Sequence, residues 1–257
     1  MAIQTFSPRA DVAIAHSRVE GKSPGVLFMG GFRSDMTGTK AAFLESRCSG
    51  REQAFVRFDY RGHGQSSGRF EDCVFSDWLR DSLDVFDNLT AGPQIVIGSS
   101  MGGWLAMLLA LQRPERIAGL ILLAPAPDFT EDIWEREFRE EERRHLAEKG
   151  VIYRPSRYGD PYALTAKLFE DGRRLLLLRR KIPIRCPVRM IHGKQDPDVP
   201  WKKSRQIQDK MTARDSKIIW VEDGDHRLSR DQDLKLIDDT LVALSSPQPP
   251  GESAAGA

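Results

Sequence analysis

The sequence has few cysteines and no long hydrophobic run. Its three cysteines, Cys48, Cys73 and Cys186, are widely spaced and form no C-x-x-C pair, which excludes a disulfide framework and a zinc framework. The longest apolar stretch, Ile117–Pro127, is about half the length that crosses a membrane. Residues Met1–His16 lack the apolar core of a signal peptide. These absences argue against a membrane span and predict a cytoplasmic protein with reduced thiols.

An excess of one charge is also missing. The 257 residues include 38 Lys and Arg against 37 Asp and Glu, a net charge of +1, so no overall basic field attracts nucleic acid. No P-loop, dinucleotide G-x-G-x-x-G or metal-ligand spacing is present, and we expect no cofactor and no metal. The expected partner is a small-molecule or acylated substrate. The oligomeric state stays open between a monomer and a weak dimer.

Short apolar runs alternate along the chain with longer amphipathic ones. The candidate strands are Val12–Ser17, Gly25–Met29, Ala54–Asp59, Gln94–Gly98, Ala118–Ala124, Pro187–His192 and Lys217–Val221. The candidate helices are Thr39–Cys48, Ser76–Leu89, Met101–Gln112, Lys202–Met211 and Asp231–Leu244. This alternation predicts an α/β fold with a mostly parallel central sheet, helices on both faces and a single domain over residues 1–244.

One region, residues 128–186, breaks the alternation. It begins with a charge-dense helical pattern over Glu131–Lys149, continues through the turn-rich Tyr153–Asp160 and ends in a second helical stretch, Tyr162–Leu178. We expect a helical cap inserted over the strand ends, with extra surface helices of no substrate role as the alternative. Residues 245–257 are mostly Ser, Pro, Gly and Ala and are predicted to be a disordered tail.

The strongest chemical signal is the G-x-S-x-G pattern of residues 98–102, Gly-Ser-Ser-Met-Gly. It follows a predicted strand and precedes a predicted helix, the context of a sharp turn that exposes the central serine at a helix N-terminus. Such a turn needs small neighbours two residues away on both sides, a condition that Ser100 meets. Ser100 is therefore the predicted nucleophile, and the neighbouring Ser99 is the alternative.

A serine nucleophile needs a base, and the chain has five histidines. His226 follows the last predicted strand, where an open α/β sheet places its catalytic groups, and it is the predicted general base. The others are expected to have different roles. His16 lies on the first strand, His63 in a turn, His145 on a charged helical face, and His192 at a strand end where its ring orders the next loop.

The orienting acid is expected between the serine and the histidine in chain order. Asp196 falls in the turn after the penultimate strand and is followed by Pro197, so it is the predicted acid, with Asp198 as the alternative. Asp225, adjacent to His226, is expected to hydrogen-bond within its own loop. The acid would hold the imidazole tautomer and stabilise the imidazolium without taking the proton.

Acyl transfer also needs donors for the developing oxyanion. The backbone N–H after the nucleophile belongs to Met101. The second is expected from Phe32, because the adjacent Gly30 and Gly31 let the main chain approach the site. Losing one such donor typically costs about 3–4 kcal/mol of transition-state stabilisation.

Two further segments resemble the α/β-hydrolase superfamily. Residues 59–66, Asp-Tyr-Arg-Gly-His-Gly-Gln-Ser, resemble its D-x-R-G-x-G-x-S motif, and residues 192–200 resemble its H-G-x-x-D-x-x-V-P motif. Other stretches are similar to a thioesterase branch of the superfamily: Gly38–Ala41, Arg57–Tyr60, Gly92–Ile95, Gly98–Trp104, Val199–Trp201 and Asp225–Arg227. The resemblance implies an α/β-hydrolase fold, the triad Ser100, Asp196 and His226, an oxyanion hole at Phe32 and Met101, and hydrolysis of S-acyl thioesters or activated carboxylic esters.

Other functions remain open on the same residues. The triad also supports amide, peroxy or carbon–carbon bond cleavage, and a non-catalytic ligand receptor can retain it. Substrate size is open as well, because the aromatic residues of the expected cap could line an acyl pocket or pack the cap onto the body. These residues are Trp134, Phe138, Tyr153, Tyr158, Tyr162 and Phe169.

Overall fold

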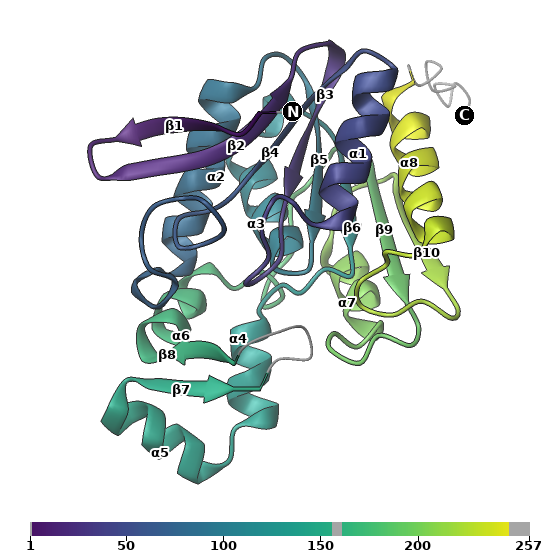
Figure 1. Cartoon of the computed structure of the whole chain (residues 1–257). Helices are drawn as coiled ribbons and strands as arrows, with labels where there is room; N and C mark the ends of the chain where they lie inside the picture. Colours follow the sequence, from purple (N-terminus) through teal and green to yellow (C-terminus); the bar gives the residue numbers. More distant parts are fainter. Residues whose placement is uncertain (1, 156–160, 247–257) are drawn as a thin grey trace.

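The computed structural model describes residues 2–155 and 161–246, in which an eight-stranded sheet has the order β1-β2-β4-β3-β5-β6-β9-β10 (Figure 1). The strands are β1 (Gln4–Arg9), β2 (Val12–Val19), β3 (Lys22–Met29), β4 (Gln53–Phe58), β5 (Gln94–Ser99), β6 (Ile117–Leu123), β9 (Val188–Gly193) and β10 (Ser216–Val221). All neighbours from β4 to β10 pair in parallel, and the β1–β2 and β2–β4 pairs are antiparallel. The predicted mostly parallel sheet is confirmed.

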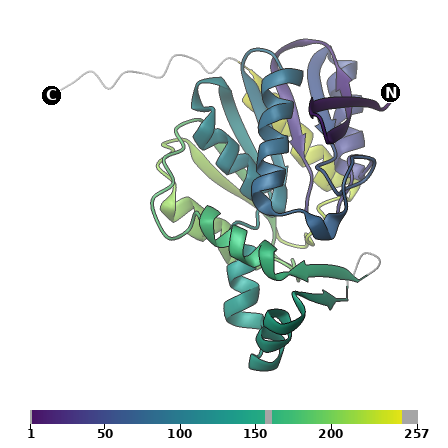
Figure 2. The same ribbon diagram turned by 90° about the vertical axis from the view of Figure 1, so that its left-hand side faces the viewer.

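Helices cover both faces of this sheet (Figures 1 and 2). One buried cluster joins the sheet to α2 (Phe75–Leu89), α3 (Met101–Gln112) and α7 (Lys202–Lys210). A second cluster on the other face joins it to α1 (Thr39–Gly50) and α8 (Asp231–Ser245). Short 3-10 turns follow at η1 (Phe70–Asp72) and η2 (Pro114–Arg116).

The sequence patterns explain how these helices pack. Helix α2 buries Phe75, Trp78, Leu79, Ser82, Val85 and Phe86, a spacing of three and four residues that forms one stripe. Helix α3 is apolar all round, and its residues from Met101 to Ala110 are buried. A helix with no polar face must lie inside the protein, so α3 is held between the central strands and α2.

The edge strand β1 was not predicted. Its sequence includes polar residues and Pro8, and none of its residues is fully buried, since it forms one edge of the sheet. Proline is tolerated there because an edge strand has one side without ladder partners. The strand therefore has no continuous apolar signal, and it forms through antiparallel pairing with β2.

The insertion between β6 and β9 lies at the carboxyl ends of the parallel strands (Figure 1). It contains α4 (Phe129–Asp132), a π-helical turn η3 (Ile133–Glu137), α5 (Glu140–Lys149), α6 (Ala166–Gly172) and a 3-10 turn η4 (Arg173–Leu175). It also contains the antiparallel strands β7 (Val151–Arg154) and β8 (Tyr162–Thr165). The expected second helical stretch therefore starts only at Ala166, because Tyr162–Thr165 pairs with β7.

Polar contacts attach the insertion to the body. Asp128, buried where the insertion starts, accepts hydrogen bonds from the backbone N–H groups of Leu177 and Leu178, both at 2.8 Å. Lys203 of α7 pairs with Asp132 of α4, and only 6% of the Lys203 side chain is exposed. Tyr158 and residues 247–257 of the expected tail lie outside the described residues. The expected tail began at residue 245, but Ser245 still belongs to α8 and Ser246 caps that helix.

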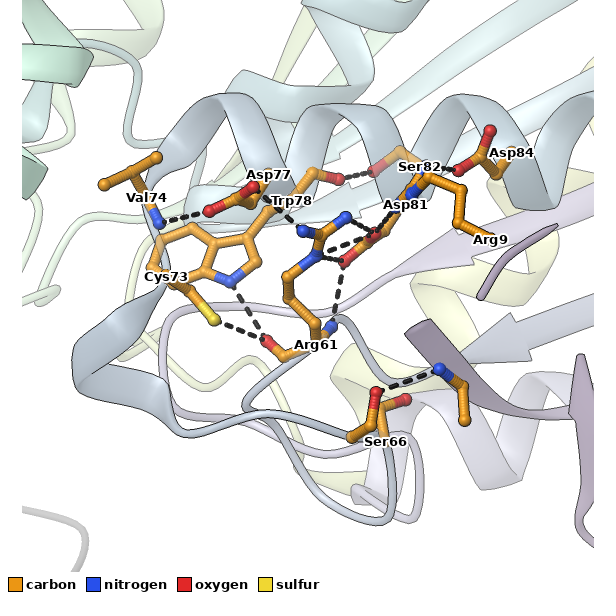
Figure 3. Close-up of polar contacts among 12 residues, drawn as sticks. Arg9, Arg61, Ser66, Cys73, Val74, Asp77, Trp78, Asp81, Ser82 and Asp84 are labelled. Atoms are coloured by element: carbon orange, nitrogen blue, oxygen red, sulfur yellow. Dashed lines mark hydrogen bonds and ion pairs between the residues drawn. The ribbon is translucent and has the colours of Figure 1, made fainter. Parts of the chain in front are cut away.

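A buried ion-pair network connects α2 to the loop after β4 (Figure 3). The Asp81 side chain has no exposed surface, and it accepts hydrogen bonds from Arg9 Nη2 at 2.9 Å and from Arg61 N and Nη2 at 2.9 and 2.6 Å. We expect Asp81→Ala to lower the free energy of unfolding by about 2–4 kcal/mol, because it leaves the half-buried Arg61 guanidinium and the Arg61 backbone N–H without their main acceptor. Urea denaturation measures this. Asp84→Ala, which removes the more exposed partner of Arg9, should cost at most about 1 kcal/mol, and equal losses in the two variants would contradict the prediction.

Candidate active site

Three loops at the carboxyl ends of β5, β9 and β10 bring Ser100, Asp196 and His226 together. His226 Nε2 lies 3.1 Å from Ser100 Oγ, and His226 Nδ1 lies 2.7 Å from Asp196 Oδ2. A carboxylate can only accept, so Nδ1 carries the proton and Nε2 is left to accept from the serine hydroxyl. This is the arrangement in which a histidine can take a proton from a serine.

Ser100 stands at a sharp turn between β5 and α3. Its φ is 54° and its ψ is −116°, a conformation that residues other than glycine rarely adopt. The turn is held by Ser100 N–H, which donates to Leu123 O at 2.9 Å, and by Ser100 O, which accepts from Gly103 N–H at 2.9 Å. A Cβ on Gly98 would lie 2.3 Å from Gly102 O, and a Cβ on Gly102 would lie 2.2 Å from Met29 O. Both glycines are therefore sterically required.

Asp196 has a full set of hydrogen-bond donors around it. Its Oδ1 accepts from the N–H groups of Asp198 and Val199, both at 2.8 Å, while its Oδ2 faces His226 and His192. Burial raises the pKa of this carboxyl, but the hydrogen bonds from His192 and His226 outweigh it, and the pKa lies well below its usual range. The side chain has no exposed surface and stays ionised at neutral pH.

His192 is wholly buried and supports this loop. Its Nε2 lies 3.0 Å from Val199 O and 3.2 Å from Asp196 Oδ2, so it carries a proton that it shares between them. Its Nδ1 accepts from Ser204 Oγ at 2.7 Å. The ring thus connects β9, the loop of Asp196 and α7.

The loop of Phe32 lies directly beside Ser100. A Cβ on Gly31 would be 3.5 Å from the Ser100 Cβ, which measures how closely the two segments approach. Phe32 follows Gly31, and Met101 is the first residue of α3. Neither backbone N–H of these two residues donates a hydrogen bond within residues 2–155 and 161–246.

The residues considered as alternatives for the nucleophile and the acid lie outside the Ser100–His226–Asp196 contacts. Ser99 ends β5, is 8% exposed, and has no hydrogen bond to a histidine in the described part of the chain. Asp198 is exposed, and its backbone N–H donates to Asp196. Asp225 accepts from the N–H groups of Arg227 and Leu228 in its own loop, both at 3.0 Å.

The aromatic residues of the insertion divide into two sets. Trp134, Phe138 and Phe169 pack against one another with ring centroids 5.3–6.1 Å apart, and they join the buried cluster that continues into the body of the protein. Tyr162 instead lies 5.8 Å from the Phe32 ring. Tyr153 is 61% exposed. Other rings around Phe32 were not predicted at the site: Phe70 and Trp78 come from the body, and Phe129 comes from α4 of the insertion.

The same loops contain a group of side chains with the donor types of a metal site. Among the described residues, ligand atoms of Asp196, Asp198 and His226 lie within 4.8 Å of one another. Two of these side chains already form the 2.7 Å contact between Asp196 Oδ2 and His226 Nδ1. A cation bound through those two atoms would break this contact, so we interpret the group as the surroundings of the Ser100–His226 pair.

Two supporting residues were not predicted for this site. Tyr60 Oη donates to Gly30 O at 3.2 Å, and Lys40 Nζ donates to the carbonyl oxygen of Arg227, next to His226. Burial, and after it the neighbouring Arg227 charge, lower the pKa of Lys40 to about 8. Both residues fall in segments that resemble superfamily motifs, and this resemblance is the sequence feature from which they could have been predicted.

The fold and the geometry around Ser100 define an α/β-hydrolase enzyme. The chain matches the model of the alpha/beta hydrolase family over residues 26–238 and belongs to that family. It is 36% identical over 249 residues to the human mitochondrial palmitoyl-protein thioesterase ABHD10, covering 94% of this chain and 81% of the relative. The resemblance to a thioesterase of this superfamily is thereby confirmed.

Solved structures agree with the sequence relatives. Alpha/beta hydrolase domain-containing protein 10 from mouse superposes with a TM-score of 0.87 at 34% identity, covering 95% of this chain and 100% of that chain. A putative hydrolase from Agrobacterium vitis gives a TM-score of 0.90 at 37% identity, covering 95% and 98%.

The relatives contradict one expectation. They are named as mitochondrial proteins, and this finding contradicts the cytoplasmic location expected from the sequence. The cysteine pattern and the lack of a long apolar run describe thiol chemistry and membrane crossing, and neither is an address signal. Separately, no helix in residues 2–155 and 161–246 has the length and apolar character needed to cross a membrane.

Proposed function

We propose that this enzyme hydrolyses S-acyl thioesters and carboxylic esters through an acyl-enzyme on Ser100. The observation that carries the proposal is the hydrogen-bonded series from Ser100 Oγ to His226 Nε2 at 3.1 Å and from His226 Nδ1 to Asp196 Oδ2 at 2.7 Å. The name of the relatives, a palmitoyl-protein thioesterase, supports thioesters as the first substrates to test.

The proposed reaction has two halves. Ser100 Oγ attacks the acyl carbonyl carbon while His226 Nε2 takes its proton, and the N–H groups of Phe32 and Met101 hold the oxyanion. His226 then protonates the leaving sulfur or oxygen as the tetrahedral intermediate collapses to the acyl-enzyme. Water repeats the sequence, with its proton passing through His226, and releases the carboxylic acid and free Ser100.

An aromatic cluster around Phe32, whose loop lies beside Ser100, supports an acyl substrate. Its half-buried rings are Phe32, Phe129 and Tyr162, with Phe32 and Phe129 centroids 5.4 Å apart. Burying an acyl chain against such rings contributes about 0.8 kcal/mol for each CH₂ group. The affinity of the enzyme for its substrate should therefore rise with chain length until this cluster is covered.

A substrate panel tests the proposed function. We expect kcat/KM of about 10⁴ M⁻¹s⁻¹ or more for the best-matched thioester or p-nitrophenyl ester. Cleavage of a substrate with a good leaving group needs only the nucleophile, the oxyanion donors and His226. Peptide amides of the same acyl group should turn over far more slowly, since their leaving nitrogen is more basic. Steady-state kinetics over several chain lengths measures both. Faster cleavage of amides than of esters would contradict the proposal, and tight ligand retention without turnover would indicate a receptor.

A further inference from the structure

The segment of residues 59–66, which we call the brace loop, has no role in the proposed chemistry, yet it contacts the loop of Phe32 repeatedly. Tyr60 Oη donates to Gly30 O at 3.2 Å, and Met36 N–H donates to Asp59 Oδ1 at 2.6 Å. Between these contacts, Arg33 N–H donates to His63 Nε2 at 3.2 Å. The brace loop therefore holds residues 30–36 at their start, middle and end. The two segments meet because they follow β3 and β4, which are parallel neighbours in the sheet.

His63 supplies the middle contact and is only 4% exposed. Its Nδ1 lies 3.2 Å from the carbonyl oxygen of Arg61, which can only accept, so Nδ1 carries the ring proton. Nε2 is thereby left unprotonated and can accept from Arg33 N–H. The contact with Arg33 requires the neutral ring, and burial together with the nearby Arg33 charge lowers the pKa of His63 to about 4.

The ring of His63 is anchored to α2. The Arg61 carbonyl also accepts from Trp78 Nε1 at 3.1 Å, and the Arg61 guanidinium pairs with Asp81 and Asp77 (Figure 3). The His63 ring packs edge-on against Trp78, with centroids 5.2 Å apart. Because α2 is packed on the sheet, the position of His63 is set by the body of the protein.

The loop of Phe32 needs such support. It begins with two glycines, Gly30 and Gly31, and Arg33 has a φ of 59°, which a residue with a side chain adopts at a cost. Resting on the function proposed above, we propose that His63 is a positioning residue of the oxyanion hole. It holds the Arg33 amide so that the adjoining Phe32 N–H stays directed at the substrate carbonyl beside Ser100.

Kinetics of three variants test this inference. His63→Phe keeps an aromatic ring but loses both hydrogen bonds, and we expect kcat to fall about ten- to a hundredfold with KM within about twofold, because the donor acts mainly in the transition state. His63→Gln places an amide oxygen near the position of Nε2 and should recover most of kcat. His16→Phe is the matched control, a histidine 4% exposed on β2 whose ring nitrogen makes one long 3.5 Å contact to Ile14 O. It should leave kcat unchanged.

Amide hydrogen exchange gives a second readout that does not need turnover. In His63→Phe, peptides covering residues 30–36 should exchange at least about tenfold faster than in the wild type, and His16→Phe should not change them. Wild-type exchange in that segment, wild-type kcat in His63→Phe, or no recovery in His63→Gln would overturn the inference. Failure of the proposed function is distinguishable, because it would appear as wild-type turnover in Ser100→Ala whatever the exchange rates.

Discussion

Replacing Ser100 by alanine is expected to lower kcat for thioesters and esters by on the order of 10⁶-fold, the loss typical of removing the nucleophile from a serine triad. The alanine leaves His226 and Asp196 in place but removes the atom that forms the acyl-enzyme. KM should change little, because the groups that hold the acyl chain and the oxyanion remain. Stopped assays at high enzyme concentration measure the residual rate, and labelling by a fluorophosphonate should disappear.

Ser99→Ala is the matched control for this change. It removes a neighbouring hydroxyl that ends β5 and has no hydrogen bond to a histidine among the described residues. We expect its activity and its labelling to stay within about threefold of the wild type, since the residual variation would come from packing alone. Labelling that survives in Ser100→Ala and disappears in Ser99→Ala would reverse the assignment of the nucleophile.

Asp196→Asn is expected to lower kcat by about 10⁴-fold while the fold stays intact. Asp196 Oδ1 accepts from two backbone N–H groups, at 2.8 Å each, so the asparagine oxygen should keep that place. The new NH₂ group would then face His226 Nδ1 and favour the tautomer with its proton on Nε2. That nitrogen would donate to Ser100 Oγ and could no longer accept its proton.

The alternative acid supplies the control for this prediction. Asp198→Asn keeps the backbone N–H that donates to Asp196, and its side chain is exposed, so we expect kcat within about fivefold of the wild type. A larger loss in Asp198→Asn than in Asp196→Asn would show that the acid is misassigned.

The dependence of activity on pH gives a further test of the role of Asp196. Because the pKa of Asp196 lies well below its usual range, any loss of activity between pH 7 and pH 5 should come from another group.

Much of the fold could be predicted because the relevant patterns are local. Strand β5 is buried along its whole length, and its continuous apolar run predicted a central strand. The edge strand β1 has no such run, and it depends on pairing with β2. The segment that forms strand β8 was expected to be helical. Four residues are too few for the hydrophobic pattern to distinguish a helix from a strand, and the pairing with β7 makes this segment a strand.

The candidate site also combines features that follow from local sequence with features that depend on the tertiary structure. Gly98 and Gly102 flank Ser100 because a Cβ at either position would collide with nearby backbone, so the motif itself specifies the turn. Ser100, Asp196 and His226 were predicted from their order along the chain and their positions after strands. The structure brings these three residues within hydrogen-bonding distance. Their catalytic roles stay a prediction until the variants are measured.

The sequence alone determined three features of this protein: its cysteine spacing, its charge balance and the G-x-S-x-G turn. Each of them depends only on composition or on sterics over a few residues. The tertiary structure decided which distant groups meet. The order of β4, β3 and β5 places the loops after these strands side by side, and His63 reaches Arg33 only for that reason. The same holds for Tyr162, which comes near Phe32 because the insertion folds back over the strand ends. Contacts between segments far apart in the chain depend on the packing of the whole sheet, which no short sequence pattern contains.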